Sequence, residues 1–192
     1  GFRPPYSRTR ITDPATGQPC PTGQSGSVEV RGPQVFPGYL DPKHDAGVFT
    51  DDGWMVTGDL GRLTDDGRLV LTGRSKDLIV RSGHNIDPAA IEDVANRFPG
   101  VDVSAAVGMP DQYAGEVPIL FIVAQKGTSV DHLDLRDHLS AHLNERPAMP
   151  RRIVTLDALP VTAVGKLFKP ALREMAIREK ITLEVEAVCG FE

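Results

Sequence analysis

Cysteine is scarce, long apolar runs are missing and no block of like charges occurs, and each absence excludes a class of protein. Two cysteines in 192 residues argue against the disulfide framework of small secreted domains. The longest apolar runs, such as residues 117–124, have the length of a strand, whereas a membrane helix needs roughly 20 residues. We therefore expect a soluble protein without a transmembrane segment, located in the reducing cytoplasm.

The charge of the chain excludes a further class. There are 26 acidic and 21 basic residues, a net charge of −5, whereas nucleic-acid-binding domains gather positive charge on one face. No nucleic-acid partner is therefore expected. The hydrophobic content of 40% suffices for the core of one or two domains. Because the chain begins at Gly1 rather than Met and no signal-peptide pattern follows, we expect it to be cut from a longer protein.

Residues 1–74 have the pattern of a β-rich region. Residues 26–32 alternate apolar and polar side chains with the period of two that a half-buried strand shows. Residues 13–17 contain the Asp, Pro and Gly of a tight turn and residues 65–67 contain Asp and Gly, and each turn separates two short strand-like runs. These runs predict β-hairpins.

Residues 78–192 alternate strand and helix patterns. Asp87 followed by Pro88 predicts a helix start, since Asp caps helix N-termini and Pro is favoured at the first helical position. Leucines at helical spacing predict a second helix over about residues 129–144, and a third helix is expected over about residues 170–178. Strands are expected over residues 77–81, 101–107, 118–123 and 151–156.

The pattern as a whole predicts an α+β protein in two parts. The first part is the β-rich region over residues 1–74, and the second is a small α+β domain over residues 78–192. The composition changes near residue 74, and we place a hinge at residues 75–77.

Three charged residues in turn-rich settings are the main candidates for chemistry. Asp59 follows a Thr-Gly pair, where a carboxylate can accept two hydrogen bonds from a vicinal diol such as a ribose. Arg74 supplies a planar guanidinium suited to phosphate or ribose oxygens. Lys166 follows Gly165 and offers a mobile point charge at a loop tip. Taken singly, the three are better explained as a turn cap, a solvated charged turn and a surface lysine.

The order and spacing of these three residues resemble the C-terminal third of the adenylate-forming superfamily. That superfamily comprises acyl-CoA synthetases, the adenylation domains of peptide synthetases, and luciferases. The similarity extends through residues 73–88 to Glu92 and covers nearly the whole chain. It implies that the chain is part of an enzyme. The phosphate loop and acyl pocket of such enzymes belong upstream, so the fragment alone should be inactive.

The resemblance assigns roles to five residues. Asp59 would bind the ribose hydroxyls of ATP and of the acyl-adenylate, Arg74 would contact the nucleotide, and Leu71 would belong to the same cofactor-binding set. Lys76 would be the pivot about which the small domain rotates. Lys166 would be the catalytic lysine, bridging the acid's carboxylate and the α-phosphate as pyrophosphate leaves.

Two further positions lie in the segment that would line the pantetheine tunnel. Gly83 would let the backbone approach the coenzyme without a Cβ in the way, although a plain turn or bulge glycine explains it equally well. His84 could touch the acyl or pantetheine chain. Elsewhere, His138 and His142 have the spacing of a metal-binding helix pair, but without a third ligand in the pattern we interpret them as solvent-facing helix residues. No metal site is predicted in this chain.

The resemblance implies an acid–thiol ligase. A carboxylic acid, fatty or aryl, would be activated with ATP and Mg²⁺ to an acyl-adenylate and transferred to coenzyme A. An adenylation domain that loads a carrier protein, and a binding module without catalysis, are the alternatives. Relatives of this type are switched off by acetylation of the lysine that Lys166 matches, so a lysine acetyltransferase is an expected partner.

Overall fold

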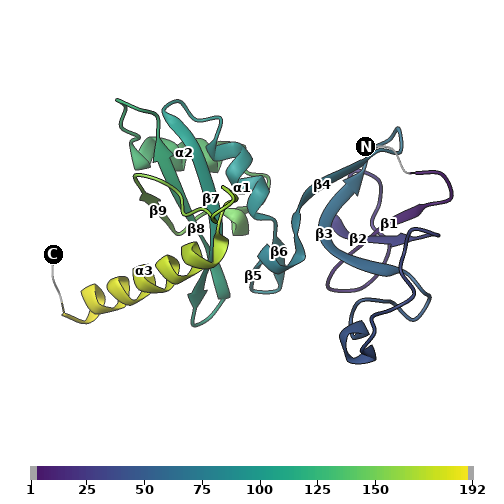
Figure 1. Ribbon diagram of the computed structural model, residues 1–192. Coiled ribbons are helices and arrows are strands. Elements are labelled where there is room, and N and C mark those ends of the chain that lie inside the picture. Colours follow the sequence, from purple (N-terminus) through teal and green to yellow (C-terminus); the bar gives the residue numbers. More distant parts are fainter. Residues whose placement is uncertain (1–3, 190–192) are drawn as a thin grey trace. The chain divides into compact units, whose positions relative to one another are not determined.

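The computed structural model of the protein describes residues 4–189, and the chain divides into two compact units, residues 1–76 and 77–192 (Figure 1). Mixed strands and helices confirm the α+β prediction. Of the helices within residues 4–189, none has the length and apolar character that a membrane span requires.

The first unit contains one antiparallel sheet in the order β1-β2-β3-β4. A short 3₁₀ helix, η1 (Pro42–Asp45), lies in the long connection between the second and third strands. The strands are β1 (Arg8–Thr12), β2 (Gly26–Arg31), β3 (Met55–Leu63) and β4 (Leu69–Arg74).

Local side-chain chemistry explains the turns of this sheet. Between β1 and β2, the Asp13 carboxylate accepts a hydrogen bond from the Ala15 amide at 2.7 Å, and Gly17 has a φ of +69°. Between β3 and β4, the Thr64 hydroxyl donates to Asp66 at 2.5 Å and Gly67 has a φ of +77°. Asp bonding to the following backbone and Gly at positive φ are the features expected of such turns.

The second unit is built on a sheet in the order β6-β5-β8-β7, with β9 lying parallel to β8. Two short 3₁₀ helices, η2 (Ser75–Asp77) and η3 (Arg146–Ala148), occur before β5 and before β9. The strands are β5 (Ile79–Arg81), β6 (His84–Ile86), β7 (Val101–Asp111), β8 (Gly115–Ala124) and β9 (Arg152–Thr155), and the helices are α1 (Pro88–Ala95), α2 (His132–His142) and α3 (Lys169–Cys189).

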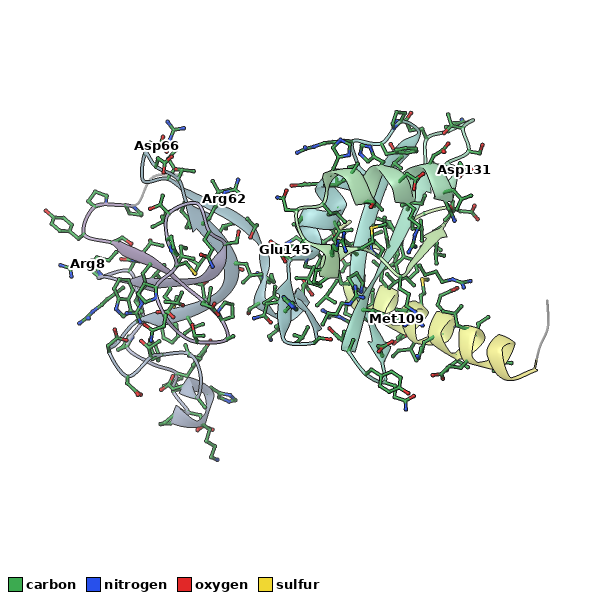
Figure 2. All side chains as sticks on the ribbon, turned by 180° about the vertical axis from the view of Figure 1, so that it is seen from behind. Arg8, Arg62, Asp66, Met109, Asp131 and Glu145 are labelled. Atoms are coloured by element: carbon green, nitrogen blue, oxygen red, sulfur yellow. The ribbon has the colours of Figure 1, made fainter. Side chains whose placement is uncertain are left out.

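Both faces of this sheet are covered, which explains why β7 and β8 read as nearly continuous apolar runs. Alternate residues of the two strands serve two separate cores. One core lies under α1 and α2, the other under α3. In Figure 2, Met109 on β7 lies beside α3, whose Leu172 and Ala176 are fully buried. The first core takes Ala106, Leu120 and Ile122 from the strands, and the second takes Ala105, Val107, Ile119 and Phe121.

The helix starts follow their caps. Asp87 accepts from the Ala89 amide at 3.0 Å with Pro88 at the first helical position, as predicted. The second helix begins at His132, later than predicted, because Asp131 is the cap that accepts from Leu133 at 2.7 Å (Figure 2). The aspartate side chain satisfies amide groups that otherwise lack a partner in the first turn.

Two expectations about segment ends were wrong. The third helix does not stop near residue 178 but runs from Lys169 to Cys189, because no Gly or Pro interrupts residues 171–189. Strands β7 and β8 are longer than predicted: the ladder between them continues past Pro110 and Pro118 to the pair of Asp111 and Gly115, although proline cannot donate a ladder hydrogen bond. Strand β6 was not predicted.

Candidate nucleotide and catalytic site

Asp59 and Arg74 lie opposite each other on paired strands. They are register partners in the β3–β4 ladder, and Arg74 Nε lies 3.1 Å from Asp59 Oδ1. The Asp59 side chain is 30% exposed and the Arg74 side chain 71% exposed. The two groups predicted to handle the nucleotide are therefore adjacent, and both remain accessible to a ligand.

The backbone around Asp59 is held by its neighbours. The Thr57 hydroxyl donates to the Val28 carbonyl at 2.8 Å and accepts from the Asp59 amide at 3.1 Å. The Ser75 hydroxyl donates to the Gly58 carbonyl at 3.1 Å. Gly58 has a φ of +76°, which a side chain would strain. Thus Thr57 and Gly58 fix the strand segment that presents the carboxylate.

A β-bulge at Thr72 decides which residues accompany Arg74. The register steps from Leu60 opposite Gly73 to Gly61 opposite Leu71, so Thr72 has no residue opposite it. Without the bulge, positions 71 and 74 would face opposite sides of the sheet. With it, Leu71 and Arg74 oppose Gly61 and Asp59, which are two residues apart on β3, and so all face the same side. The Leu71 side chain is 58% exposed there.

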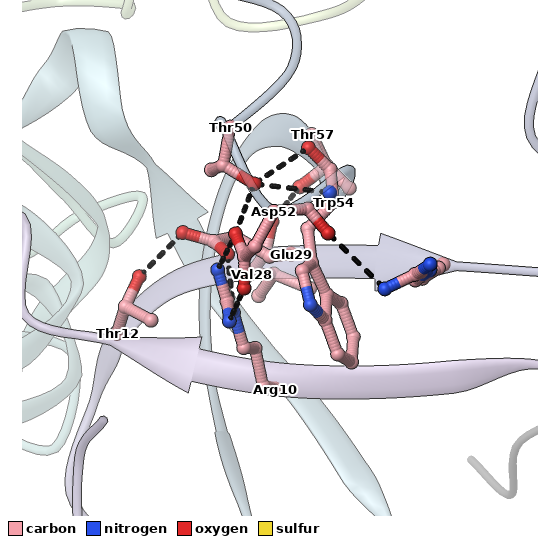
Figure 3. Close-up of polar contacts among 9 residues, drawn as sticks. Arg10, Thr12, Val28, Glu29, Thr50, Asp52, Trp54 and Thr57 are labelled. Atoms are coloured by element: carbon pink, nitrogen blue, oxygen red, sulfur yellow. Dashed lines mark hydrogen bonds and ion pairs between the residues drawn. The ribbon is translucent and has the colours of Figure 1, made fainter. Parts of the chain in front are cut away.

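A side-chain network anchors the segment that leads into β3 (Figure 3). Arg10 donates to Glu29 at 2.6 Å and to both carboxylate oxygens of Asp52 at 2.6 and 3.0 Å, and its guanidinium lies 4.6 Å from the Trp54 ring centroid. The hydrogen bonds from Arg10 and Thr50 lower the pKa of Asp52 to about 2. These residues support the strand that carries Asp59.

Lys166 occupies a tight hairpin. The Thr162 amide donates to the Lys166 carbonyl at 2.7 Å, and the Gly165 amide donates to the Thr162 carbonyl at 2.8 Å. Gly165 has a φ of +78°, the left-handed conformation that closes three-residue hairpin loops. The residue is exposed, and its ammonium group makes no ion pair within the described residues 4–189. Its charge is thus presented on an ordered backbone.

Gly83 closes the β5–β6 hairpin. Ser82 and Gly83 both have positive φ, +49° and +83°, as in the two-residue turns that join antiparallel strands. A Cβ on Gly83 would meet no atom within 4 Å. The neighbouring His84 is exposed and pairs with Arg81 across the turn. The turn accounts for this glycine, and the approach of a coenzyme remains a prediction.

The remaining predicted positions are the hinge residue Lys76 and the histidine pair of the second helix. Lys76 lies in η2 and is the last residue of the first unit. His138 was expected to face solvent, and this was wrong: it is half-buried, lies 5.4 Å from the Phe98 ring, and its Nε2 is 3.2 Å from the Val94 carbonyl. Among residues 4–189, no group of three or more His, Cys, Asp or Glu side chains could hold a metal ion.

An open hollow of about 600 Å³ lies between α2 and β9, and none of the predicted site residues lines it. Two of its arginines are already paired, Arg151 with Asp111 at 2.9 Å and Arg152 with Glu179 at 2.6 Å. Because these two arginines are ion-paired and no predicted site residue lines the hollow, we do not assign it to the site expected around Asp59 and Lys166.

Sequence reasoning missed the ion pairs that fix the start of α3. Lys169 pairs with Glu92 and Arg173 pairs with Asp77. Glu92 was noted only as the end of the similar segment. The one local signal for these pairs is the presence of two cations near a helix start, where acidic residues are usual.

Residues 90–166 match the family model described as the AMP-binding enzyme C-terminal domain. The chain is 38% identical to the marinolic acid-CoA ligase of a Pseudoalteromonas species, over 92% of this chain and 28% of the ligase. It is 42% identical to the 2-hydroxy-7-methoxy-5-methyl-1-naphthoate-CoA ligase of Streptomyces carzinostaticus, over 91% of this chain and 31% of that ligase. The chain therefore spans about three tenths of the length of these relatives.

Solved structures give the same picture. ATP-bound MatB from Rhodopseudomonas palustris is 37% identical with a TM-score of 0.82, over 91% of this chain and 35% of MatB. The amide bond synthetase McbA from Marinactinospora thermotolerans is 35% identical with a TM-score of 0.80, over 91% of this chain and 36% of McbA. The arrangement of strands and helices is thus that of the corresponding part of these enzymes.

Proposed function

The chain belongs to the adenylate-forming, AMP-binding enzyme family as a C-terminal portion, and on this premise we propose that the full-length protein is an ATP-dependent acyl-CoA synthetase. The observation that carries the proposal is the placement of Asp59, Leu71 and Arg74 on one face of a sheet in a chain about 40% identical to CoA ligases. A sheet holds such groups in fixed geometry, which is what binding a constant part of a substrate needs.

The nucleotide is the constant part. Asp59 accepts hydrogen bonds from the two ribose hydroxyls, and Arg74 donates to ribose or phosphate oxygens. Leu71 offers an exposed apolar side chain on the same face, suited to the nucleoside. The ion pair between Asp59 and Arg74 is exposed, so its own contribution to stability is small and a ligand can compete with it.

The first half-reaction uses Lys166. A carboxylate oxygen of the acid attacks the α-phosphorus of ATP, the bond from that phosphorus to the bridging oxygen breaks, and pyrophosphate leaves. Mg²⁺ bound with ATP would neutralise part of the phosphate charge. The Lys166 ammonium stabilises the negative charge shared by the acid and the α-phosphate. Its place on a hairpin whose backbone is hydrogen-bonded supports this role.

The second half-reaction needs different groups. The thiol of coenzyme A loses its proton and attacks the acyl carbon, the acyl–oxygen bond breaks, and AMP leaves. Rotation of the second unit about Lys76 replaces Lys166 by the Gly83 hairpin, where the open space around the glycine accepts the pantetheine chain. His84, exposed beside that turn, contacts the acyl or pantetheine chain. The rotation also keeps water from the mixed anhydride.

The acceptor and the acid are part of this proposal. The two relatives described above are named for marinolic acid and a naphthoate, which supports a fatty or aryl acid here. Transfer to an amine is the second candidate, favoured by the likeness to the amide bond synthetase McbA. Loading of a carrier protein is the third possibility raised by the sequence. We place the protein in the cytoplasm, where ATP and coenzyme A are available.

Regulation at Lys166 follows from its exposure. The side chain is accessible to a lysine acetyltransferase, and acetylation removes the charge that adenylation requires. Mass spectrometry of the full-length protein treated with such an enzyme tests this. A protein that remains unmodified at Lys166 while it is fully active would exclude the regulation.

The deciding experiment measures AMP and pyrophosphate release by the full-length protein with ATP and a panel of carboxylic acids. Coenzyme A, amines and no acceptor are compared, beside a Lys166→Ala variant. AMP release that needs both an acid and coenzyme A supports the synthetase. Acid-dependent pyrophosphate exchange with turnover only on amines favours amide synthesis. If no acid causes release of AMP or pyrophosphate, the proposal is contradicted.

A further inference from the structure

Two ion pairs hold the beginning of α3. Lys169 Nζ lies 3.2 Å from Glu92 Oε1 on α1, and Arg173 Nη2 lies 2.9 Å from Asp77 Oδ1 in η2. The two cations are four residues apart, so they lie on one face of the helix. That face is thereby tied both to α1 and to the residue that follows Lys76.

The pair between Lys169 and Glu92 is largely shielded from solvent. Their side chains are only 18% and 19% exposed. The same Glu92 oxygen also accepts a hydrogen bond from the Ala106 amide on β7 at 2.9 Å. One carboxylate thus joins α1, β7 and α3, and removing its cation would leave a shielded charge without its partner.

This pair lies next to the Lys166 hairpin. Lys169 is three residues beyond Lys166. Between them, the Phe168 amide donates to the Pro160 carbonyl at 2.8 Å and closes the base of the hairpin. The chain leaving the hairpin therefore reaches a fixed point directly after that base.

The position of the cation argues against a purely stabilising role. Lys169 is the first residue of α3, where the helix dipole disfavours positive charge. Burial of Leu172 and Ala176 already attaches the helix to the sheet. Residues that go against a local preference, as a cation at a helix N-terminus does, and that stability does not require are commonly found at functional sites.

We propose that Glu92 and Asp77 are positioning residues for Lys166. Through Lys169 and Arg173 they fix the start of α3, and so they set the direction in which the hairpin presents the Lys166 ammonium. Neither acid contacts substrate. The inference rests on the proposed function, because it assigns these pairs to the adenylation half-reaction alone.

The test uses the full-length protein with Lys169→Met, Lys169→Arg and Glu92→Gln. Each half-reaction is measured separately: pyrophosphate formation from acid and ATP, and thioester formation from synthetic acyl-adenylate and coenzyme A. Misplacing Lys166 should lower kcat of adenylation by roughly 10- to 100-fold in Lys169→Met and Glu92→Gln. The KM for ATP and the thioester step should not change, and Lys169→Arg should restore adenylation.

Lys180→Met is the matched control, because it removes a cation from the same helix whose ion pair, with the exposed Glu184 at 3.2 Å, lies within α3 and does not join the helix to α1 or η2. If circular dichroism shows that Lys169→Met does not fold, Asp77→Asn replaces it, because this variant removes the other ion pair at the start of α3. Equal losses in both half-reactions, or full adenylation by Lys169→Met where Lys166→Ala is inactive, would overturn the positioning role. A wild type that adenylates no acid would overturn the proposed function itself.

Discussion

The β3–β4 pair in the first unit and the Lys166 hairpin in the second present their functional groups in opposite ways. Asp59 and Arg74 are the end pair of the β3–β4 ladder, where they form an ion pair, and hydrogen bonds with Thr57 and Ser75 hold the backbone beside Asp59. Lys166 stands at an exposed hairpin where hydrogen bonds to Thr162 hold its backbone, while its side chain extends into solvent. One region fixes side chains, and the other fixes only the base from which a side chain extends.

The difference matches the two kinds of task in a two-step reaction. A group that holds the nucleotide is needed in both steps, and a sheet keeps its geometry constant. A group needed in one step must enter and leave, and an exposed hairpin allows this without unfolding. If this comparison is right, changes to the ladder affect both half-reactions, whereas changes to the hairpin affect one.

The largest effect is expected for Lys166→Ala in the full-length protein. If the Lys166 ammonium stabilises the reacting phosphate as proposed, its loss should lower adenylation by about 100- to 1000-fold, as removal of one transition-state donor does. Thioester formation from synthetic acyl-adenylate should be unchanged. Lys126→Ala is the control. Like Lys166, Lys126 is exposed and lies next to a turn glycine, in this case Gly127, which has a φ of +81°. Equal loss in both half-reactions would contradict the division of tasks.

Asp59→Asn should lower kcat/KM for ATP by about 10- to 100-fold, because hydrogen bonds to a charged acceptor contribute roughly 1.5–3 kcal/mol. Both half-reactions should suffer, since the nucleotide remains bound throughout. The specific check is 2′-deoxy-ATP: the wild type should prefer ATP, and the variant should discriminate much less. Asp65→Asn, in the exposed turn after β3, serves as the control. If Asp59→Asn still prefers ATP to 2′-deoxy-ATP as strongly as the wild type does, Asp59 does not bind the ribose hydroxyls.

Gly83→Ala and Gly67→Ala form a matched pair, one from each unit. Both glycines close hairpins at similar φ, +83° and +77°, with open space around an added Cβ. Each substitution should destabilise its unit by about 1–2 kcal/mol through backbone strain. Thermal unfolding should show similar losses, but only Gly83→Ala should slow thioester formation. If both variants keep normal thioester formation, Gly83 is a turn residue and nothing more.

The smallest effect concerns acid stability of the first unit. The pKa of Asp52 is lowered from 3.8 to about 2, chiefly by its hydrogen bond from Arg10. Because the folded pKa is depressed, the contribution to stability is present above pH 3.8 and is lost as pH falls through about 2. An NMR titration of the Asp52 carboxylate measures this directly. Arg10→Met should return the carboxylate toward its ordinary pKa, and a titration midpoint near 3.8 in the wild type would refute the assignment.

Local signals in the sequence predicted the parts of the fold that depend on neighbouring residues. The cap at Asp87 and the turns at residues 13–17 and 65–67 appeared as expected, because a few adjacent residues form the bonds that define them. Strand β6, of three residues, was not predicted because so short a run has no measurable period. The end of the third helix was missed because the apolar residues after position 178, Ile181, Leu183 and Val185, alternate with a period of two and not with helical spacing, although no Gly or Pro interrupts the backbone.

The sequence by itself determined the family, the order of Asp59, Arg74 and Lys166, and the glycines that their turns need. Those features are local, or lie in motifs whose spacing is visible along the chain. The tertiary structure alone decided that a bulge at Thr72 brings Leu71 to the face of Arg74, and that Glu92 meets Lys169 from a helix far away in sequence. Strand register and contacts between distant helices arise from packing of the whole unit, and no short segment encodes them.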